Sequence, residues 1–389
     1  MQIYLDHSAT TPPHPDVIAK VQAVLSEQWG NPSSLHAWGE RSAMELEMAR
    51  VETAQLIGAT NPESIIFTSG GTEADNLALL GVAEQYASPQ HLIISSVEHS
   101  AIEKTAQRLE SWGWEVTRLG VNEKGRIHPW DLEQAIQSNT VLISIIYGQS
   151  EVGTLQPIPE LAKIARSRGV LFHTDAVQVA GRLPVNVEQL GVDLLSLSGH
   201  KMYGVQGAGA LYVRDGLEIQ PWLSGGGQER GLRSGTQAVS AIAALGVAAQ
   251  IARLEMPDEI PRLEGLREQL FDLLADCPYV IPSGDRAHRL PHHVSFVVDS
   301  PEENMTGKTL VRQLNLAGIA VSAGSACNSG KLKPSPVLSA MGYSEKMALS
   351  GLRLTLGRST TSEDIEWTAM VFKQVLQRLI KESSLVLAK

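Results

Sequence analysis

Lys201 lies in the segment SLSGHKMYGVQGAGALYV, directly after an apolar run that is typical of a strand. Gly199 and Gly204 flank it, so the chain can turn sharply here and bring the lysine close to a ligand. A primary amine in such a loop can form a covalent link with a carbonyl group. A lone loop lysine is more often a solvated surface residue, so its neighbours decide between the two interpretations.

Asp175 ends a second apolar run, VLFHTD, where an unpaired charge would be costly. The protonated pyridine nitrogen of pyridoxal 5'-phosphate (PLP) would be a suitable partner, because the carboxylate would hold that nitrogen protonated. Gln178, three residues later, is placed to donate to the phenolic oxygen of the same ring. Taken alone, Asp175 is better interpreted as a cap of the next helix.

A phosphate would need its own anion site, and the segment SGGTE at residues 69–73 offers one. It lies between the strand-like run IIFT and a helical pattern that begins near Thr72. Free amides and hydroxyls at the start of a helix bind phosphate well. His99, in SSVEHSAIEK, follows another apolar run and could lie flat on the pyridine ring. A glycine turn is also common as a purely structural link, and a lone histidine more often caps a helix.

The elements that must position these residues are short apolar runs alternating with helical patterns. Strands are predicted at IIFTS, HLIISS, VLISIIYG, VLFHTD, DLLSLS and GALYV, with helices between most of them. This alternation is typical of an α/β fold with a mostly parallel, helix-covered sheet. Functional groups are then expected where the strands end.

The pattern changes after the glycine-rich segment GGGQERGLRSG. A long helical pattern covers residues 238–275, and isolated strands at HVSFVVD, IAVS and LRLTL then alternate with helices. This second pattern indicates a smaller α+β domain. We expect a large domain over residues 15–257 and a small domain made of residues 1–14 and 258–389.

The overall composition restricts the class of protein. A chain of 389 residues with 43% apolar content can bury more than one core. Its formal charge of −10 argues against a broad surface for nucleic acid or anionic lipid, so we expect direct binding to neither. No signal-like N-terminus and no uninterrupted apolar run of membrane-spanning length is seen, which predicts a cytoplasmic protein. The two cysteines form no Cys-x-x-Cys pair and indicate neither a disulfide framework nor a metal site.

Eight segments then occur in order along nearly the whole chain: YLDHSATTP, FTSGGTEADNLAL, VEHSAI, HTDAVQ, SLSGHKMYG, GGGQERGLRSGT, SAGSACNSG and LRLTLGR. Together they resemble the NifS/IscS-like cysteine desulfurases, which belong to the class V aminotransferase-like, fold-type I PLP enzymes. Any one segment is a weak signal, but the ordered set is specific.

The resemblance implies a role for each motif residue. Lys201 would hold PLP covalently, Asp175 would pair with the pyridine nitrogen, and His99 would stack on the ring and assist proton transfer. Gln178 would contact the phenolic oxygen, and Arg353 would bind the substrate carboxylate. The implied phosphate ligands are Gly71, Thr72, Ser198 and His200, joined by Thr236 from a neighbouring subunit. The resemblance therefore implies a homodimer with shared active sites.

One segment, YGQSEVGT, departs from the family pattern. The family usually has two asparagines before Glu-Val-Gly or Glu-Ile-Gly, and the second contacts the cofactor oxygen and the substrate carboxylate. This chain has Gln149 and Ser150 instead. Ser150 is then a candidate substrate contact. Its hydrogen bond could be direct or pass through a water molecule, or Gln149 could supply it instead.

Cys327 lies in a run of small and polar residues, SAGSACNSGKLKPSP, and we expect a mobile loop over about residues 322–336. The neighbouring Lys331 and Lys333 favour the thiolate form. Cys277 follows an apolar helical stretch and is interpreted as structural.

The implied reaction converts L-cysteine to L-alanine, with the sulfur accepted by Cys327 and passed to an acceptor such as an iron-sulfur scaffold protein. A selenocysteine lyase would use the same cofactor residues and is the nearest alternative. An ordinary aminotransferase would have no use for Cys327 in a mobile loop. A PLP-binding protein without turnover is a further alternative, because Ser150 departs from the family pattern.

Overall fold

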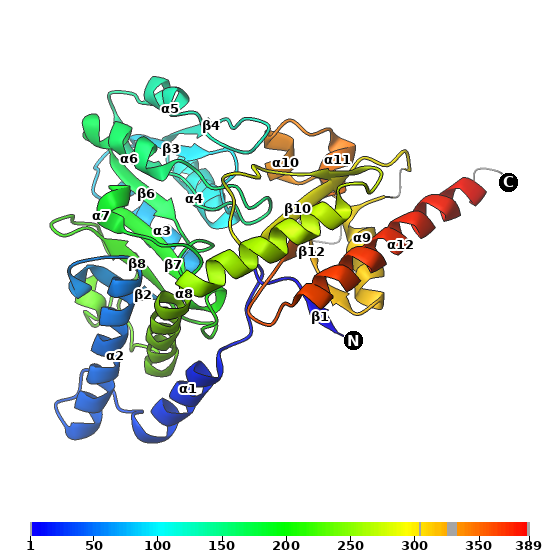
Figure 1. Cartoon of the computed structure of the whole chain (residues 1–389). Helices are drawn as coiled ribbons and strands as arrows, with labels where there is room; N and C mark the ends of the chain where they lie inside the picture. Colours follow the sequence, from blue (N-terminus) through cyan, green and yellow to red (C-terminus); the bar gives the residue numbers. More distant parts are fainter. Residues whose placement is uncertain (1, 303–304, 325–332, 387–389) are drawn as a thin grey trace.

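A seven-stranded sheet forms the centre of the computed structural model, which describes residues 2–302, 305–324 and 333–386 (Figure 1). Its strands are β2 (Ile65–Thr68), β3 (His91–Ser95), β4 (Glu115–Leu119), β5 (Thr140–Ser144), β6 (Leu171–Asp175), β7 (Leu194–Ser198) and β8 (Gly209–Val213). They lie in the order β2-β8-β7-β6-β5-β3-β4, and only β8 is antiparallel to its neighbours. The predicted mostly parallel sheet is confirmed. Strand β4 is additional, and the apolar pattern misses it because most of its residues are not buried.

Helices cover both faces of this sheet. In β5, Ile143 contributes to one apolar core and Leu142 to another; in β7, Leu195 and Leu194 do the same. Burial on both faces explains why these strands are nearly continuous apolar runs. The helices of this part are α1 (Pro15–Glu27), α2 (Ala37–Leu56), α3 (Gly71–Ala83), α4 (Ser100–Ser111), α5 (Pro129–Ala135), α6 (Ile158–Ser167) and α7 (Val187–Leu190), with single 3-10 turns at Pro62–Ser64, Gly199–Lys201 and Glu229–Gly231.

The C-terminal part of the chain builds its own core around an antiparallel sheet. The strands are β9 (Val280–Pro282), β10 (His293–Val298), β12 (Ser322–Ala323) and β13 (Leu352–Thr355), in the order β12-β13-β10-β9, and the helices are α9 (Gly307–Leu316), α10 (Pro336–Ala340), α11 (Glu345–Leu349) and α12 (Ser362–Val386). The N-terminal strand β1 (Ile3–Tyr4) pairs in parallel with β11 (Ile319–Ala320). On this basis we propose the two domains expected from the sequence, residues 15–257 and residues 1–14 with 258–389.

Helix α8 (Val239–Leu274) joins the two parts and continues through Pro257 and Pro261. Its first half packs in the core of the seven-stranded sheet, and its second half, from Leu263 onward, packs in the C-terminal core. By length and composition alone, α8 is the one described helix that could cross a membrane, yet half of its most apolar window is buried inside the protein. Such burial is typical of a core helix.

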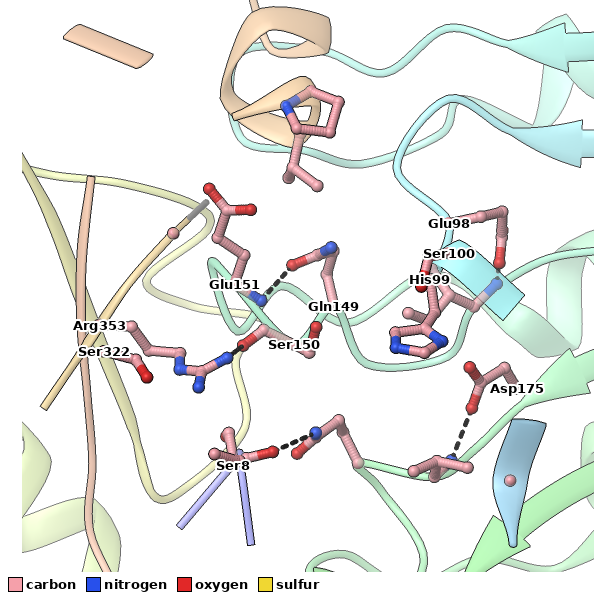
Figure 2. A pocket seen from close by; sticks show the side chains of 18 of the residues that line it. Ser8, Glu98, His99, Ser100, Gln149, Ser150, Glu151, Asp175, Ser322 and Arg353 are labelled. Carbon is pink, nitrogen blue, oxygen red and sulfur yellow. Dashed lines mark hydrogen bonds between the residues drawn. The ribbon is translucent and has the colours of Figure 1, made fainter. Parts of the chain in front are cut away.

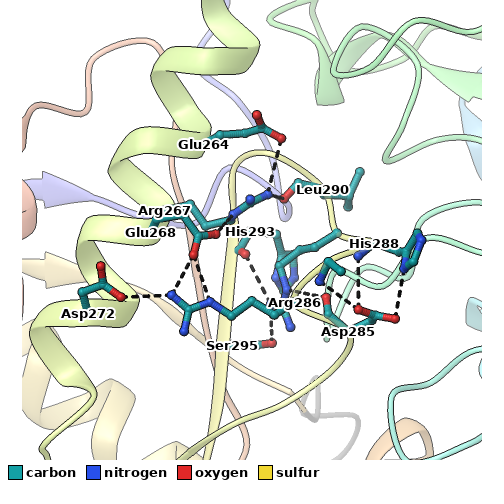
Figure 3. Close-up of polar contacts among 12 residues, drawn as sticks. Glu264, Arg267, Glu268, Asp272, Asp285, Arg286, His288, Leu290, His293 and Ser295 are labelled. Atoms are coloured by element: carbon teal, nitrogen blue, oxygen red, sulfur yellow. Dashed lines mark hydrogen bonds and ion pairs between the residues drawn. The ribbon is translucent and has the colours of Figure 1, made fainter.

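Charged side chains of α8 hold the segment that precedes β10 (Figure 3). Arg286 donates to Glu268 at 2.7 Å and to Asp272 at 3.0 Å. The segment leads to His293, whose Nε2 lies 3.1 Å from the carbonyl oxygen of Ser150. The polar contacts of α8 therefore help to place the turn that carries Ser150.

The carboxyl ends of the central strands meet at one edge of the sheet. Strand β6 ends at Asp175, β7 ends at Ser198, and β3 ends three residues before Glu98. The N-terminal segment crosses this edge, where the amide of Thr11 donates to the carbonyl of His200 at 3.0 Å. Because parallel strands point the same way, residues far apart in the sequence meet here, as the sequence predicts.

Candidate functional site

A cavity of about 930 Å³ opens at this edge of the sheet (Figure 2). Its size lies within the range of ligand-binding cavities in proteins. Residues from both parts of the chain line it, among them Asp175 from β6 and Ser322 and Arg353 from β12 and β13. Most of the side chains singled out from the sequence therefore share one cavity.

The amine of Lys201 points into this cavity. Its Nζ donates to the carbonyl oxygens of Ser8 at 2.6 Å and Ala9 at 2.8 Å. Burial and the nearby Arg353 guanidinium lower the pKa of Lys201 to about 8. The amine therefore gives up its proton more readily than an exposed lysine does.

Asp175 is buried at the end of β6, and its Oδ1 accepts a hydrogen bond from the amide of Val177 at 2.9 Å. Burial raises its pKa, while His99 and Lys201 oppose the rise. His99 caps α4 through Nδ1, which accepts from the amide of Ala101 at 3.2 Å, and the same ring lines the cavity. His99 thus caps a helix as its sequence context allows, whereas no helix follows Asp175 directly and its hydrogen bond to Val177 lies in a turn; both residues also face the cavity.

The start of α3 forms one wall of the cavity. The helix begins at Gly71 without a side-chain hydrogen bond at its cap, which leaves its first amides available to an anion. A Cβ at Gly71 would lie 2.6 Å from Cγ2 of Val177, so the turn has no room for a side chain. Thr72 and Ser198 also line this wall.

His200 and Gln178 lie beside this wall. His200 Nδ1 is 3.1 Å from Oγ1 of Thr10, and burial together with Lys201 lowers the pKa of His200 to about 4. His200 is therefore a neutral ring near physiological pH. Gln178 is buried and donates through Nε2 to the Ser8 carbonyl at 2.9 Å.

Arg353 forms the opposite wall and joins the two parts of the chain. Its Nη1 donates to the Ser150 carbonyl at 3.0 Å, and its Nη2 pairs with Oδ1 of Asp6 at 2.8 Å. The other carboxylate oxygen of Asp6 accepts from Ser322 at 3.0 Å. The Nε of Arg353 is buried and has no hydrogen-bond partner in the described parts of the chain. This N–H is therefore a buried donor whose hydrogen bond is unmade within these parts.

The two residues that depart from the family pattern have different surroundings. The Gln149 side chain is engaged by the backbone: Nε2 donates to the Val97 carbonyl at 3.1 Å, and Oε1 accepts from the amides of Glu151 and Val152. Ser150 lies beside Arg353 on the cavity wall. Of the two, Ser150 is the better candidate for a ligand contact, and we keep it as a proposal.

Two residues singled out from the sequence remain, Thr236 and Cys327. Thr236 is exposed and is absent from the lining. Cys327 lies outside the described residues, although Gly324 and Lys333, which flank the segment 325–332, line the cavity.

Sequence reasoning missed four acidic residues of the site: Asp6, Asp75, Glu98 and Glu151. Asp6 stands in the quoted motif YLDHSATTP without an assigned role, and it holds Arg353. Glu151 is buried, and burial raises its pKa to about 7. Asp75, in GTEADNLAL, and Glu98, in SSVEHSAI, have polar neighbours in the sequence, so no local signal distinguishes them from exposed acids.

As a set, these residues suit a ligand with three different ends. The Lys201 amine suits a carbonyl group, the buried Asp175 carboxylate suits a cation, and the uncapped start of α3 suits a phosphate. Arg353 is left to bind a second molecule that carries a carboxylate.

Comparisons with known proteins agree over nearly the whole chain. The sequence pattern of the family described as Aminotransferase class-V matches residues 3–367. Cysteine desulfurase IscS of Dictyoglomus turgidum is 43% identical over 380 residues, covering 97% of this chain and 95% of that protein. A solved NifS-like protein is similar with a TM-score of 0.90 and 33% identity, covering 97% of this chain and 100% of the other. The structure of SspA in complex with cysteine has a TM-score of 0.78 and 34% identity, covering 92% and 99%.

Proposed function

The chain belongs to the aminotransferase class-V family, and we propose that it is a PLP-dependent cysteine desulfurase. It would convert L-cysteine to L-alanine and pass the sulfur first to its own Cys327 and then to an acceptor. The observation that carries this proposal is the convergence of Lys201, Asp175 and Arg353 on one cavity. The similarity to proteins named cysteine desulfurase supports the same reaction.

The residues of the cavity fit PLP as the cofactor. The cavity combines an amine of lowered pKa, a buried carboxylate and a glycine turn that is too tight for a Cβ. When bound, PLP supplies an electron sink for negative charge at the substrate Cα. The residues that we assign to it are Gly71, Thr72, His99, Asp175, Gln178, Ser198, His200 and Lys201, with Thr236 reaching the phosphate of the partner subunit's site.

Substrate binding depends on Arg353 in this proposal. The substrate carboxylate takes the free Nε–H and one Nη–H, because these two donors lie side by side on the guanidinium. Asp6 keeps the guanidinium in place through its bond to Nη2. Ser150 lies next to this contact and leaves more room there than the usual asparagine.

Proton transfer at the substrate Cα is assigned to Lys201 or His99. With its pKa near 8, Lys201 is partly unprotonated near neutral pH and can accept the Cα proton at Nζ. His99 faces the same cavity and offers a second ring nitrogen, since Nδ1 is occupied by the helix cap.

Sulfur transfer is assigned to Cys327. Its thiolate attacks the substrate sulfur, so that a sulfur–sulfur bond forms and the carbon–sulfur bond of the substrate breaks. The carbon skeleton takes up protons and leaves as alanine, and Cys327 keeps the extra sulfur as a persulfide. This sulfur then passes to an acceptor, such as an iron-sulfur scaffold protein or a protein of thio-cofactor synthesis.

We also propose that the protein acts as a homodimer in the cytoplasm. Met44, Met48 and Val51 form one exposed apolar row on α2, beside a surface cavity shared with α8. Such a row at helical spacing suits burial by another surface, and Thr236 is exposed as the shared site requires. Sedimentation analysis tests the dimer, because a monomer at assay concentrations would contradict it. Cell fractionation tests the location.

The proposed function is tested by adding L-cysteine to the purified, PLP-loaded protein. We expect alanine in stoichiometric excess over enzyme, together with one additional sulfur on the Cys327 peptide that a reductant removes. A keto acid in place of alanine would indicate an ordinary aminotransferase. Binding of PLP without any alanine would indicate a protein that keeps the cofactor without turnover.

A selenocysteine lyase remains the second candidate, because it would use the same cofactor residues. Measuring kcat/KM for cysteine and selenocysteine separates the two. We expect efficient cysteine turnover that is lost when Cys327 is replaced.

A further inference from the structure

A second buried acid, Asp75, lies beside Asp175. One side-chain oxygen of each, together with a ring nitrogen of His99, all lie within 4.8 Å of one another. Asp75 belongs to α3, where its neighbours Ala74 and Leu77 are buried and apolar, and Asp75 itself is only 1% exposed. Its Oδ1 has no hydrogen-bond partner among the residues that the structure describes. An acid in this position needs a physical explanation.

Two carboxylates this close in a buried site are not both ionised at low cost. Asp175 has the contacts that stabilise a charge, because it accepts a backbone hydrogen bond and lies near His99 and Lys201. The nearest basic atom to Asp75 is Nε2 of His173, at 3.8 Å. Burial lowers the pKa of His173 to about 3, so that ring is neutral.

The groups that face Asp75 from the other elements do not supply a compensating charge. Glu98 lies between β3 and α4; its Oε1 accepts from Ser95 Oγ and from the Ile146 amide at 2.8 Å, while Oε2 has no partner in the described chain. Burial raises the pKa of Glu98 to about 8. The ring nitrogen of His99 lies within 4.8 Å of both carboxylates, so His99 is not a partner of Asp75 alone. Burial and the neighbouring Asp175 accordingly raise the pKa of Asp75 well above its usual range.

We propose that Asp75 is a positioning residue that stays protonated in the folded protein, so that Asp175 alone carries the negative charge of the pair. The inference rests on the proposed role of Asp175 toward the cofactor nitrogen. An ionised Asp75 would drive a proton onto Asp175, and the ring nitrogen would lose its counter-charge. Asp75 thus sets the charge of Asp175 without touching the cofactor.

The first test measures thermal unfolding of the cofactor-free protein as a function of pH. An acid whose pKa is higher in the folded than in the unfolded chain stabilises the fold at low pH, and this stability is lost as the pH rises toward the folded pKa. Asparagine does not titrate. We therefore expect Tm to fall less between mildly acidic and mildly alkaline pH in Asp75→Asn than in the wild type.

A matched control is Glu229→Gln, which changes a buried carboxylate that is paired. Glu229 accepts from Arg50 at 2.9 Å, and its side chain is also fully buried. Removing this charge leaves the guanidinium with the exposed Glu47 as its remaining ion-pair partner, so we expect a lower Tm at every pH. A weaker pH dependence of Tm in Asp75→Asn indicates a protonated acid, whereas a lower Tm at every pH in Glu229→Gln indicates an ionised one.

A second test uses infrared spectroscopy and does not depend on Asp75→Asn folding well. Glu98→Gln combined with Glu151→Gln removes the two other acids of the site whose pKa burial raises to about 7 or above, and we expect a protonated-carboxyl C=O band to remain in the cofactor-free protein at neutral pH. In folded Asp75→Asn we expect PLP affinity within about threefold of the wild type, since the change keeps the neutral state.

Absence of the band in the variant that carries both Glu98→Gln and Glu151→Gln, or an unchanged pH dependence of Tm in Asp75→Asn, would overturn the proposal. A loss of PLP affinity of tenfold or more in Asp75→Asn would also contradict it, because it would show that Asp75 acts as an anion. The thermal and infrared measurements use cofactor-free protein. They therefore stand even if the chain proves not to be a desulfurase.

Discussion

Replacing Arg353 with lysine tests the substrate-binding half of the site. Arg353 is fixed by Asp6 and by the Ser150 carbonyl, and its buried Nε has no partner in the described chain. Lysine keeps the positive charge and can still pair with Asp6, but it cannot present two parallel N–H groups to a carboxylate. The change therefore removes one charge-assisted hydrogen bond, which is worth about 1.5–3 kcal/mol.

That energy corresponds to a loss of about 10- to 150-fold in kcat/KM for L-cysteine. We expect the loss mainly in KM, because the carboxylate is bound equally in the ground state and the transition state. Alanine formation measured over a range of cysteine concentrations gives both constants. Arg214→Lys, in a half-exposed pair with Asp193, is the control and should leave both constants unchanged.

Two results would refute this reasoning. Wild-type kcat/KM in Arg353→Lys would show that the guanidinium does not bind the carboxylate. Loss of PLP affinity with an unchanged KM would place Arg353 at the cofactor instead.

Three further predictions follow from the proposed roles. Lys201→Ala should abolish the borohydride-reducible link to PLP, and peptide mapping that found the link on another lysine would contradict the assignment. Asp175→Asn should keep the fold but lose at least about tenfold in turnover, because an amide cannot hold the ring nitrogen protonated; full alanine production would disprove this. Cys327→Ser should still bind PLP and cysteine, as measured by absorbance, but make almost no alanine. Sulfur found on Cys277 of the wild type would show that Cys327 is not the acceptor.

The sequence by itself determined six of the seven strands of the central sheet and the residues at their ends. Lys201, Asp175 and His99 each follow a run of apolar residues, and such runs predict strands because burial on both faces of a parallel sheet requires them. The common direction of the strands then brings these residues to one edge. Local patterns were sufficient here, because each residue needs only its own strand for its position.

Only the tertiary structure decided which acids and carbonyls surround them. Asp6 and Arg353 are separated by 347 positions and meet because β1 and β13 belong to the same part of the fold. Asp75 looks like an ordinary polar residue of α3 until packing buries it within 4.8 Å of Asp175. Burial and pairing depend on contacts between distant segments, and no local spacing encodes them. The charge that each of these groups carries was therefore settled by the fold and not by the motif.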